Sequence, residues 1–476
     1  MSGHYGDSPT SMTLSQQLAS FGAALRLEDL PASVVEMAGK CLLDWMGSVL
    51  AGSTQPPAAM ARRYVALLGG HPDATVFGTA LRTAVAQAAF LNGLACHVVE
   101  MDDLHRPSTL HPAAPVVSAA VAAAEREGVS GRRLVEAIVV GYEVAIRIAE
   151  AVNPSHYRFW HNTATCGTFG AAAAVAKVLG LDPQAFAHAL GSAGSQAAGL
   201  WEFMRDGAMT KHLHAGQAAL NGVTAAYLAR EGFTGAQAIL EGDRGFFRAM
   251  AKEADPSRVT QDLGRRFKIM EDSFKMFPCC GHTHSAVSAA LELRRQHGFS
   301  PGELQRVEVR TYAAALEIAG HVSPRTPYEA KFSLPYTVAA ALVRGRLGLQ
   351  EFETAALSDP DIEAVRRSVH LALDPQHDAA YPACWGATVE VQLQSGTRLE
   401  AFSDRAPGEE GHALSFPQLE EKFRDMVAWA CGQSPQTQEQ IRRFEGFGEM
   451  ARQVPAWACV ADVLRQLAGA PTAASR

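Results

Sequence analysis

The feature that most constrains the fold is a long series of helix-forming segments, which runs from Leu14 to about Gly264. The segment "PASVVEMAGKCLLDWMGSVLAG" starts with a proline, has apolar residues at helical spacing and stops at a glycine. "TATCGTFGAAAAVAKVLG" and "KHLHAGQAALNGVTAAYLAREG" follow the same pattern and are rich in alanine and glycine. Small side chains let helices pack closely, and a helix that is apolar on all sides is buried. The sequence therefore predicts a large all-helical domain.

The pattern changes after Lys268. "RVEVRTY" and "ATVEVQLQSGTRLEAF" alternate apolar and polar residues with a period of two, and Ser395-Gly396 suits a hairpin turn within the second run. Helical stretches such as "SLPYTVAAALVRG" lie between the two, and "FPQLEEKFRDMVAWACG" returns to helix near the C-terminus. We therefore predict a mainly α protein. Residues 1–269 form a helical domain that residues 406–476 complete, and residues 270–405 form a smaller, inserted α+β domain.

Length and charge narrow the class of protein. A chain of 476 residues is too long for one ordinary core, so two domains are expected. The net charge of −7 offers no basic surface for a nucleic acid. No segment approaches the roughly 18 consecutive apolar residues that a membrane helix needs, and "MSGHYGDSPTSM" is too polar for a secretory signal. The eight cysteines are scattered apart from Cys279 and Cys280, which favours a reduced, cytoplasmic protein.

Familiar cofactor motifs are absent from the sequence. It has no glycine-rich dinucleotide fingerprint, no phosphate loop, no serine-hydrolase elbow, no HExxH and no CxxC. We therefore expect chemistry without a cofactor or a metal.

Four polar stretches interrupt the apolar helices. They are "HVVEMDDLHRPSTLHPAAP" with Glu100, Asp102, Asp103, His105 and His111, "HYRFWHNTATCGTFG" with His156 and His161, "DGAMTKHLHAG" with Lys211, His212 and His214, and "DSFKMFPCCGHTHSAV" with Lys275, Cys279, Cys280, His282 and His284. Each places cationic or titratable groups at or near the start of an apolar helix. Helix N-termini attract anions and repel lysines. Lysines in these places indicate an anionic ligand between them and the helix.

Each stretch alone also has a structural explanation. Asp102 and Asp103 suit a helix cap, His161 suits a satisfied core histidine, and Lys211 or Lys275 suits the surface. The adjacent cysteines with His282 and His284 suggest zinc, but adjacent cysteines point in different directions and the usual ligand spacing is missing. Recurrence of one pattern four times favours a functional site.

Long motifs in this sequence resemble the MmgE/PrpD family, which includes 2-methylcitrate dehydratases, cis-aconitate decarboxylases and an iminodisuccinate epimerase. The motifs are "DDLHRPSTLHPAAPV", "GYEVAIRIAEAV", "FWHNTATCGTFGAAAAVAKVLGLD", "GAMTKHLHAGQAALNGVTAAYLAREGFTGAQAILEG", "FKMFPCCGHTHSAVSAAL", "PYEAKFSLPYTVAAAL" and "LEEKFRDM". The resemblance implies a large all-helical domain, an α+β domain that acts as a lid, an active site between them, and a homodimer.

The resemblance also implies a set of site residues. The catalytic residues are His111, His161, Lys211, Asp102 and Asp103, and the substrate-binding residues are Lys275, Cys280, His282, His284 and Tyr142. A base removes a proton next to a carboxylate, and an acid helps the hydroxyl to leave. Lysines and histidinium neutralise the substrate carboxylates and the developing charge, while the two aspartates orient the histidines and offset the positive charge of the empty pocket.

Two positions depart from the family pattern. Many relatives have Thr or Ser where this chain has Leu104, and the decarboxylases have a histidine near Cys280. These departures argue against a cis-aconitate decarboxylase. We therefore predict a cofactor-independent dehydratase that removes an α-proton from a small di- or tricarboxylate of the 2-methylcitrate type. The first alternative is a dicarboxylate epimerase, and the less favoured alternatives are a decarboxylase, a metal-dependent hydrolase and a non-catalytic binder of organic acids.

Overall fold

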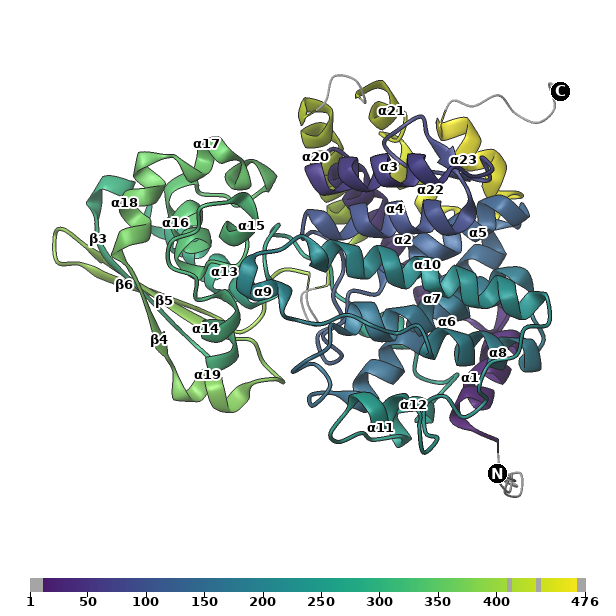
Figure 1. Ribbon diagram of the computed structural model, residues 1–476. Coiled ribbons are helices and arrows are strands. Elements are labelled where there is room, and N and C mark those ends of the chain that lie inside the picture. Colours follow the sequence, from purple (N-terminus) through teal and green to yellow (C-terminus); the bar gives the residue numbers. More distant parts are fainter. Residues whose placement is uncertain (1–11, 409–412, 434–437, 469–476) are drawn as a thin grey trace.

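The computed structural model describes residues 12–408, 413–433 and 438–468. Figure 1 shows a large helical part beside a smaller part that contains a sheet. The mainly α fold predicted from the sequence is confirmed. In the described ranges, no helix combines the length and the apolarity needed to cross a membrane.

The helical part is built from closely packed helices. They are α1 (Leu14–Ala24), α2 (Ala32–Ser53), α3 (Pro56–Leu68), α4 (Val85–Val98), α5 (Ala113–Glu127), α6 (Gly131–Val152), α7 (Asn162–Leu179), α8 (Pro183–Gly194), α9 (Phe203–Asp206), α10 (Thr210–Arg230), α11 (Phe246–Met250) and α12 (Ser257–Thr260). Ser130 caps α6 by accepting a hydrogen bond from the Arg133 amide. A Cβ on Gly170 of α7 would lie 2.7 Å from the carbonyl oxygen of Gly141 in α6. The small residues therefore set the close approach of these helices.

This part is not wholly helical, which corrects the expectation from the sequence. Strands β1 (Ala74–Thr75) and β2 (Arg82–Thr83) form a short antiparallel ribbon. Glu125 of α5 anchors the ribbon, because its carboxylate accepts bonds from the amide and the hydroxyl of Thr75 at 2.7 and 2.8 Å. A buried carboxylate needs such donors, and the ribbon provides them.

The C-terminal helices return to the helical part. They are α20 (Phe416–Gln433), α21 (Gln438–Arg442), α22 (Phe447–Arg452) and α23 (Val460–Ala468). Figure 1 shows them beside the N-terminal helices. Lys422 of α20 donates to Asp44 of α2 at 2.5 Å and to the carbonyl of Met101 at 2.7 Å. One hydrophobic core therefore contains residues from both ends of the described chain.

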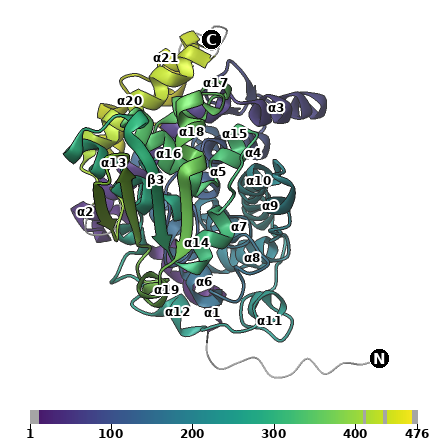
Figure 2. The same ribbon diagram turned by 90° about the vertical axis from the view of Figure 1, so that its left-hand side faces the viewer.

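The smaller part holds a four-stranded sheet in the order β4-β3-β5-β6. Its strands are β3 (Leu304–Thr311), β4 (Val369–Leu373), β5 (Ala387–Leu393) and β6 (Arg398–Ser403), and its helices are α13 (His284–His297), α14 (Ala313–Ala319), α15 (Pro327–Ala330), α16 (Leu334–Arg344), α17 (Thr354–Leu357), α18 (Pro360–Ser368) and α19 (Pro375–Ala380). Strand β4 pairs parallel with β3, and the other pairs are antiparallel. The turn expected at Ser395-Gly396 joins β5 to β6, with φ of 86° at Gly396. Figure 2 shows this part in front of the helical part.

The smaller part has its own hydrophobic core, which runs from Phe277 to Val391. Phe274 still belongs to the core of the helical part. The chain therefore passes from one core to the other between Phe274 and Phe277. Lys275 lies at this crossing, next to the loop that contains the acidic stretch.

Candidate active site

The acidic stretch forms a buried loop, residues 99–112, between α4 and α5. Glu100 and Thr109 have φ of 59° and 48°, a region that side chains other than glycine rarely adopt. Lys331 of the smaller part holds the first turn by donating to the carbonyl of Val99 at 2.6 Å. Asn162 holds the second turn, at Thr109, by donating to the hydroxyl of that residue at 3.1 Å. Such strained positions often occur at functional sites.

A cavity beside this loop is lined by residues of both parts of the molecule. The lining residues are Glu100, Leu104, Thr109, His111, Tyr157, His161, Trp201, Lys211, Lys275, Cys280, Gly281, His282, Ile318, Phe332 and Trp385. The structure therefore brings together six residues predicted from the sequence, namely His111, His161, Lys211, Lys275, Cys280 and His282. Their chemical roles remain predictions.

Two lysines enter the cavity from different parts of the chain and meet one glutamate. Lys211, in the first turn of α10, and Lys275 both donate to the carboxylate of Glu100, the latter at 3.0 Å. Glu100 is 1% exposed. Burial opposes its ionisation, but the charges of Lys211 and Lys275 outweigh burial and hold the pKa of Glu100 well below its usual value. The three side chains form a compact ionic cluster.

Glu100 was not among the predicted site residues. The sequence pattern predicts charge compensation by Asp102 and Asp103, but the carboxylate between the lysines belongs to Glu100. The available signal was its place in the same acidic stretch, two residues before the aspartate pair. The sequence could not show that the chain reverses at Glu100 and turns this side chain toward α10.

His111 is placed to act as a base. Its Nδ1–H donates to the carbonyl of Asp103 at 2.6 Å, which leaves Nε2 with a free electron pair. The carboxylate of Asp102 lies 3.5 Å from the same Nδ1. Burial lowers the pKa of His111 to about 3, against the opposing charge of Asp102. The imidazole is therefore neutral in this cavity.

Further histidines pack around His111. The ring of His97 lies 4.9 Å from that of His111 and stacks on His161 at 5.5 Å. His97 donates from Nδ1 to Asp102 at 2.7 Å. Nδ1 of His161 lies 3.2 Å from Nδ1 of His214. Burial, together with the charge of neighbouring histidines, lowers the pKa of His161 well below its usual value. His97, which the sequence analysis did not select, thus fixes Asp102 and packs against both lining histidines.

The smaller part contributes a thiol and an aromatic surface. His282 stacks on Trp385 with 4.2 Å between ring centroids, and its Nδ1 lies 2.7 Å from the Tyr312 hydroxyl. Burial lowers the pKa of His282 to about 3. Burial also raises the pKa of the Cys280 thiol, so this cysteine is protonated and poorly nucleophilic.

Four predicted residues do not line the cavity. Asp103 accepts bonds from the Ala113 amide at 3.0 Å and from the Tyr142 hydroxyl at 2.5 Å, so it caps α5. Asp102 is bonded to His97 at 2.7 Å and lies 3.5 Å from Nδ1 of His111. Nε2 of His284 lies 3.2 Å from the Cys279 carbonyl oxygen, in the core of the smaller part. Tyr142 and His284 are both bonded to buried partners, and the substrate contacts expected for them remain predictions.

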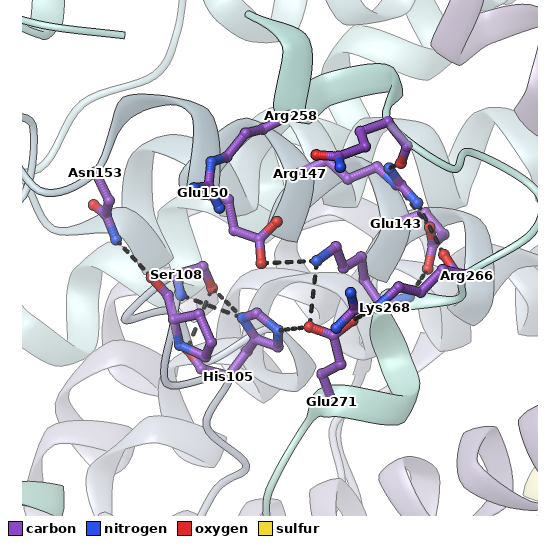
Figure 3. A network of polar contacts seen from close by, with 12 residues as sticks. His105, Ser108, Glu143, Arg147, Glu150, Asn153, Arg258, Arg266, Lys268 and Glu271 are labelled. Carbon is purple, nitrogen blue, oxygen red and sulfur yellow. Dashed lines mark hydrogen bonds and ion pairs between the residues drawn. The ribbon is translucent and has the colours of Figure 1, made fainter. Parts of the chain in front are cut away.

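A second polar network anchors the loop from outside the cavity (Figure 3). Nδ1 of His105 lies 2.8 Å from the Ser108 hydroxyl, and its Nε2 lies 3.7 Å from Glu271. Lys268 donates to Glu150 of α6 at 2.9 Å and to Glu271 at 3.2 Å. Lys268 and Glu271 begin and end the short 3-10 helix η2 (Lys268–Glu271). This network ties the loop to α6 and to the crossing between the two cores.

Three clusters of described residues have the composition of a metal site: His97, Asp102 and His111; Cys41, Asp103 and Asp272; and His105, Glu150 and Glu271. In the first, Nδ1 of His97 is bonded to Asp102 and Nδ1 of His111 to a carbonyl. In the second, Asp103 already accepts two hydrogen bonds. In the third, Lys268 bridges the two carboxylates. The donors therefore fit hydrogen-bond networks better than a metal ion.

Comparison with known proteins follows the same division of the chain. Residues 16–259 match the model of the MmgE/PrpD N-terminal domain, and residues 277–444 match that of the MmgE/PrpD C-terminal domain. The second match extends into α20 and α21, which pack in the helical part.

Several curated relatives match most of the chain. A cis-aconitate decarboxylase of Homo sapiens is 29% identical over 441 residues, which cover 88% of this chain and 90% of the relative. A cis-aconitate decarboxylase-like protein of Aspergillus oryzae is 28% identical, covering 89% of this chain and 92% of the relative. A 2-methylcitrate dehydratase of Cupriavidus necator is 25% identical, covering 83% and 86%.

Proposed function

Because the chain belongs to the MmgE/PrpD family, we propose that it is a lyase that acts on a small di- or tricarboxylate. The observation that carries this proposal is the pair of lysines in the same cavity as a neutral histidine with a free Nε2. Lysines bind carboxylates and stabilise negative charge that develops next to them. A neutral imidazole accepts a proton.

The proposed reaction is a β-elimination of water. Nε2 of His111 takes the proton from the carbon next to a carboxylate, and the electron pair of that C–H bond forms the new double bond. The C–O bond to the hydroxyl group breaks, and the leaving oxygen takes a proton from the Lys211 ammonium to become water. The charge of Lys275, whose pKa Glu100 raises against the effect of burial, stabilises the enolate-like charge. The proton on His111 later restores the lysine.

Substrate binding would make His111 a stronger base. In the empty cavity burial lowers the pKa of this residue to about 3, and the two lysines add to that effect. Carboxylates that pair with the lysines reduce their repulsion of an imidazolium, which raises the pKa of His111 toward neutrality. The base is therefore activated by the substrate that it deprotonates.

A decarboxylase is the second candidate, because decarboxylases are among the curated relatives that match most of the chain. The same lysines would stabilise the carbanion that remains when carbon dioxide leaves. Leu104 and Cys280, the two departures from the family pattern noted in the sequence, support the dehydratase as the first candidate. An epimerase would use the same proton abstraction and return the proton to the opposite face.

We also propose that the smaller part is a lid. Lys275 reaches Glu100, Lys331 reaches the Val99 carbonyl, and the Ser273 hydroxyl donates to the Leu104 carbonyl. These bonds to the loop are few and polar, so they can break and re-form as substrate enters. In this division the helical domain comprises residues 1–269 and 406–476, and the lid comprises residues 270–405.

The test is NMR of di- and tricarboxylates incubated with the protein in heavy water. A dehydratase gives an unsaturated acid with the same number of carboxylates, a decarboxylase gives one carboxylate fewer, and an epimerase gives a deuterated stereoisomer. Binding without exchange or product would contradict the lyase and leave an organic-acid binder.

Treatment with a strong chelator is the matching test for a metal-dependent hydrolase. We expect activity to persist after chelation, because the candidate ligands are committed to hydrogen bonds. Loss of activity that zinc or iron restored would contradict the mechanism above.

A further inference from the structure

The ionic groups on the cavity wall leave little positive charge for a substrate. Among the lining residues in the described part of the chain, the charged groups are Glu100, Lys211 and Lys275. One glutamate against two lysines leaves a single net positive charge. Asp102, which bonds to His97 and lies 3.5 Å from Nδ1 of His111, adds a negative charge close by. The lining histidines are held neutral by burial. Two substrate carboxylates can each pair with one lysine, whereas a third would have no cationic partner among the lining residues of the described chain.

Two other cations lie near the cavity without lining it. Lys331 directs its ammonium to the Val99 carbonyl at 2.6 Å. Arg106 places its guanidinium 4.3 Å from the centre of the Trp385 ring. His282 stacks on the same ring at 4.2 Å. Arg106 and His282 therefore contact opposite faces of the Trp385 ring. Each cation has a structural partner and lies outside the lining residues.

One side of the wall is apolar. A Cβ built on Gly281 would lie 3.1 Å from Leu104 Cδ2 and 3.5 Å from Trp385 Cζ3, so these three residues adjoin one another. Gly281 begins η3 (Gly281–Thr283), against which α14 packs, and α14 carries Ile318 into the cavity. Phe332 adds a ring whose centroid lies 5.1 Å from Lys211 Nζ. A carboxylate placed on this surface would be buried without a partner, which is costly.

From this wall we infer that the substrate is a dicarboxylate with an apolar substituent, not a tricarboxylate. The two carboxylates would pair with Lys211 and Lys275, and an alkyl group would lie against Leu104, Gly281 and Trp385. This inference rests on the proposed lyase function and adds to it the class of substrate.

Isocitrate and 3-isobutylmalate form a matched pair of probes. They share the malate skeleton, and a terminal carboxylate in one is replaced by an isopropyl group of similar shape in the other. In the elimination the C3 proton passes to His111, the C2–O bond breaks, and water leaves with a proton from Lys211. The product is aconitate or its isobutyl analogue. We would measure kcat/KM for all stereoisomers by NMR and dissociation constants by calorimetry.

We expect 3-isobutylmalate to exceed isocitrate in kcat/KM by about tenfold or more, because a single methylene group in an apolar pocket is worth roughly 10- to 200-fold. The dissociation constant of 3-isobutylmalate should likewise be lower than that of isocitrate. If isocitrate is preferred by tenfold, the inference is wrong while the lyase proposal stands. If neither acid reacts, the lyase proposal fails for this class, and the two dissociation constants still decide the inference.

Leu104 offers a variant that tests the wall directly. Leu104→Thr should lower the preference for 3-isobutylmalate over isocitrate by about tenfold. Leu104→Ile, which keeps the apolar volume, is the matched control and should retain the preference. Thermal melting checks that both variants fold. An unchanged ratio in a folded Leu104→Thr variant would overturn the inference.

Discussion

Glu100 combines an unfavourable backbone conformation with two buried ion pairs. Its φ of 59° turns the side chain from the end of α4 toward Lys211 and Lys275. Two neighbouring cations keep a buried carboxylate ionised, whereas a buried carboxylate without a cation would be protonated. The strained residue thus joins two lysines that lie far apart in the sequence.

The role of His111 is tested by replacing it with alanine. We expect turnover to fall by about 10²–10⁴-fold, because the variant loses the group that accepts the proton. The free energy of unfolding should change by about 1 kcal/mol, since the ring makes one strong hydrogen bond, to the Asp103 carbonyl. Steady-state kinetics and thermal melting measure the two effects. Full turnover by the variant would exclude His111 as the base.

Lys211 is tested by replacement with methionine, which keeps the apolar stem. We expect KM to rise by about 10- to 100-fold, because a charge-assisted hydrogen bond to the substrate is lost. Because Lys211 also delivers the leaving-group proton in the proposed reaction, kcat should fall as well. Lys275→Met is the matched control, in which kcat should fall only through weaker charge stabilisation. An unchanged KM in Lys211→Met would place this lysine outside the substrate site.

At the scale of elements, the 3-10 helix η2 fixes the loop through Glu271. Burial opposes ionisation of Glu271, but the nearby His105 imidazole and the charge of Lys268 outweigh burial and lower the pKa of Glu271 to about 2. A lowered pKa means that the stabilisation is present above the unfolded value near 4.5 and is lost as pH falls toward 2.

Glu271→Gln should therefore lower stability at neutral pH by about 1 kcal/mol, because the pair is partly exposed and screened. The difference from the natural protein should shrink between pH 4.5 and pH 2. Denaturant unfolding across this range measures it. Glu292→Gln, an exposed carboxylate paired with Arg295 on α13, is the control and should change stability less. A constant difference at all pH values would show that Glu271 does not act through its charge.

At the scale of the molecule, an apolar groove on α3, α4 and α10 suits the homodimer implied by the family. Met60, Tyr64, Met209 and Leu213 line it and are 46%, 55%, 51% and 43% exposed. Large apolar patches usually mark interaction surfaces. His212, next to Lys211, also lines the groove, so a partner seated there would brace the start of α10.

We predict that the protein is a homodimer and that Leu213→Glu dissociates it, because a charge would be buried in the interface. Light scattering at micromolar concentration measures the mass. Leu373→Glu, on β4 and 51% exposed outside the groove, is the control and should leave the mass unchanged. A monomeric natural protein, or a dimeric Leu213→Glu variant, would exclude this surface.

The sequence by itself determined the family, the mainly helical composition and the hairpin at Ser395-Gly396. These features depend on neighbours along the chain: small residues at helical spacing, alternation in strands, and a glycine that tolerates positive φ. It also predicted that lysines and histidines gather around an anion, because a position at the start of a helix can be recognised from the neighbouring residues.

Only the tertiary structure decided which of these groups meet. Asp44 and Lys422 form a buried pair although 378 positions separate them. Glu100 lies between the lysines because the chain reverses at this residue. Tyr142 lies outside the cavity lining because its hydroxyl donates a hydrogen bond to the buried carboxylate of Asp103. Such contacts depend on how whole elements pack, and packing is set by the sum of many weak interactions across the fold, not by the residues beside each group.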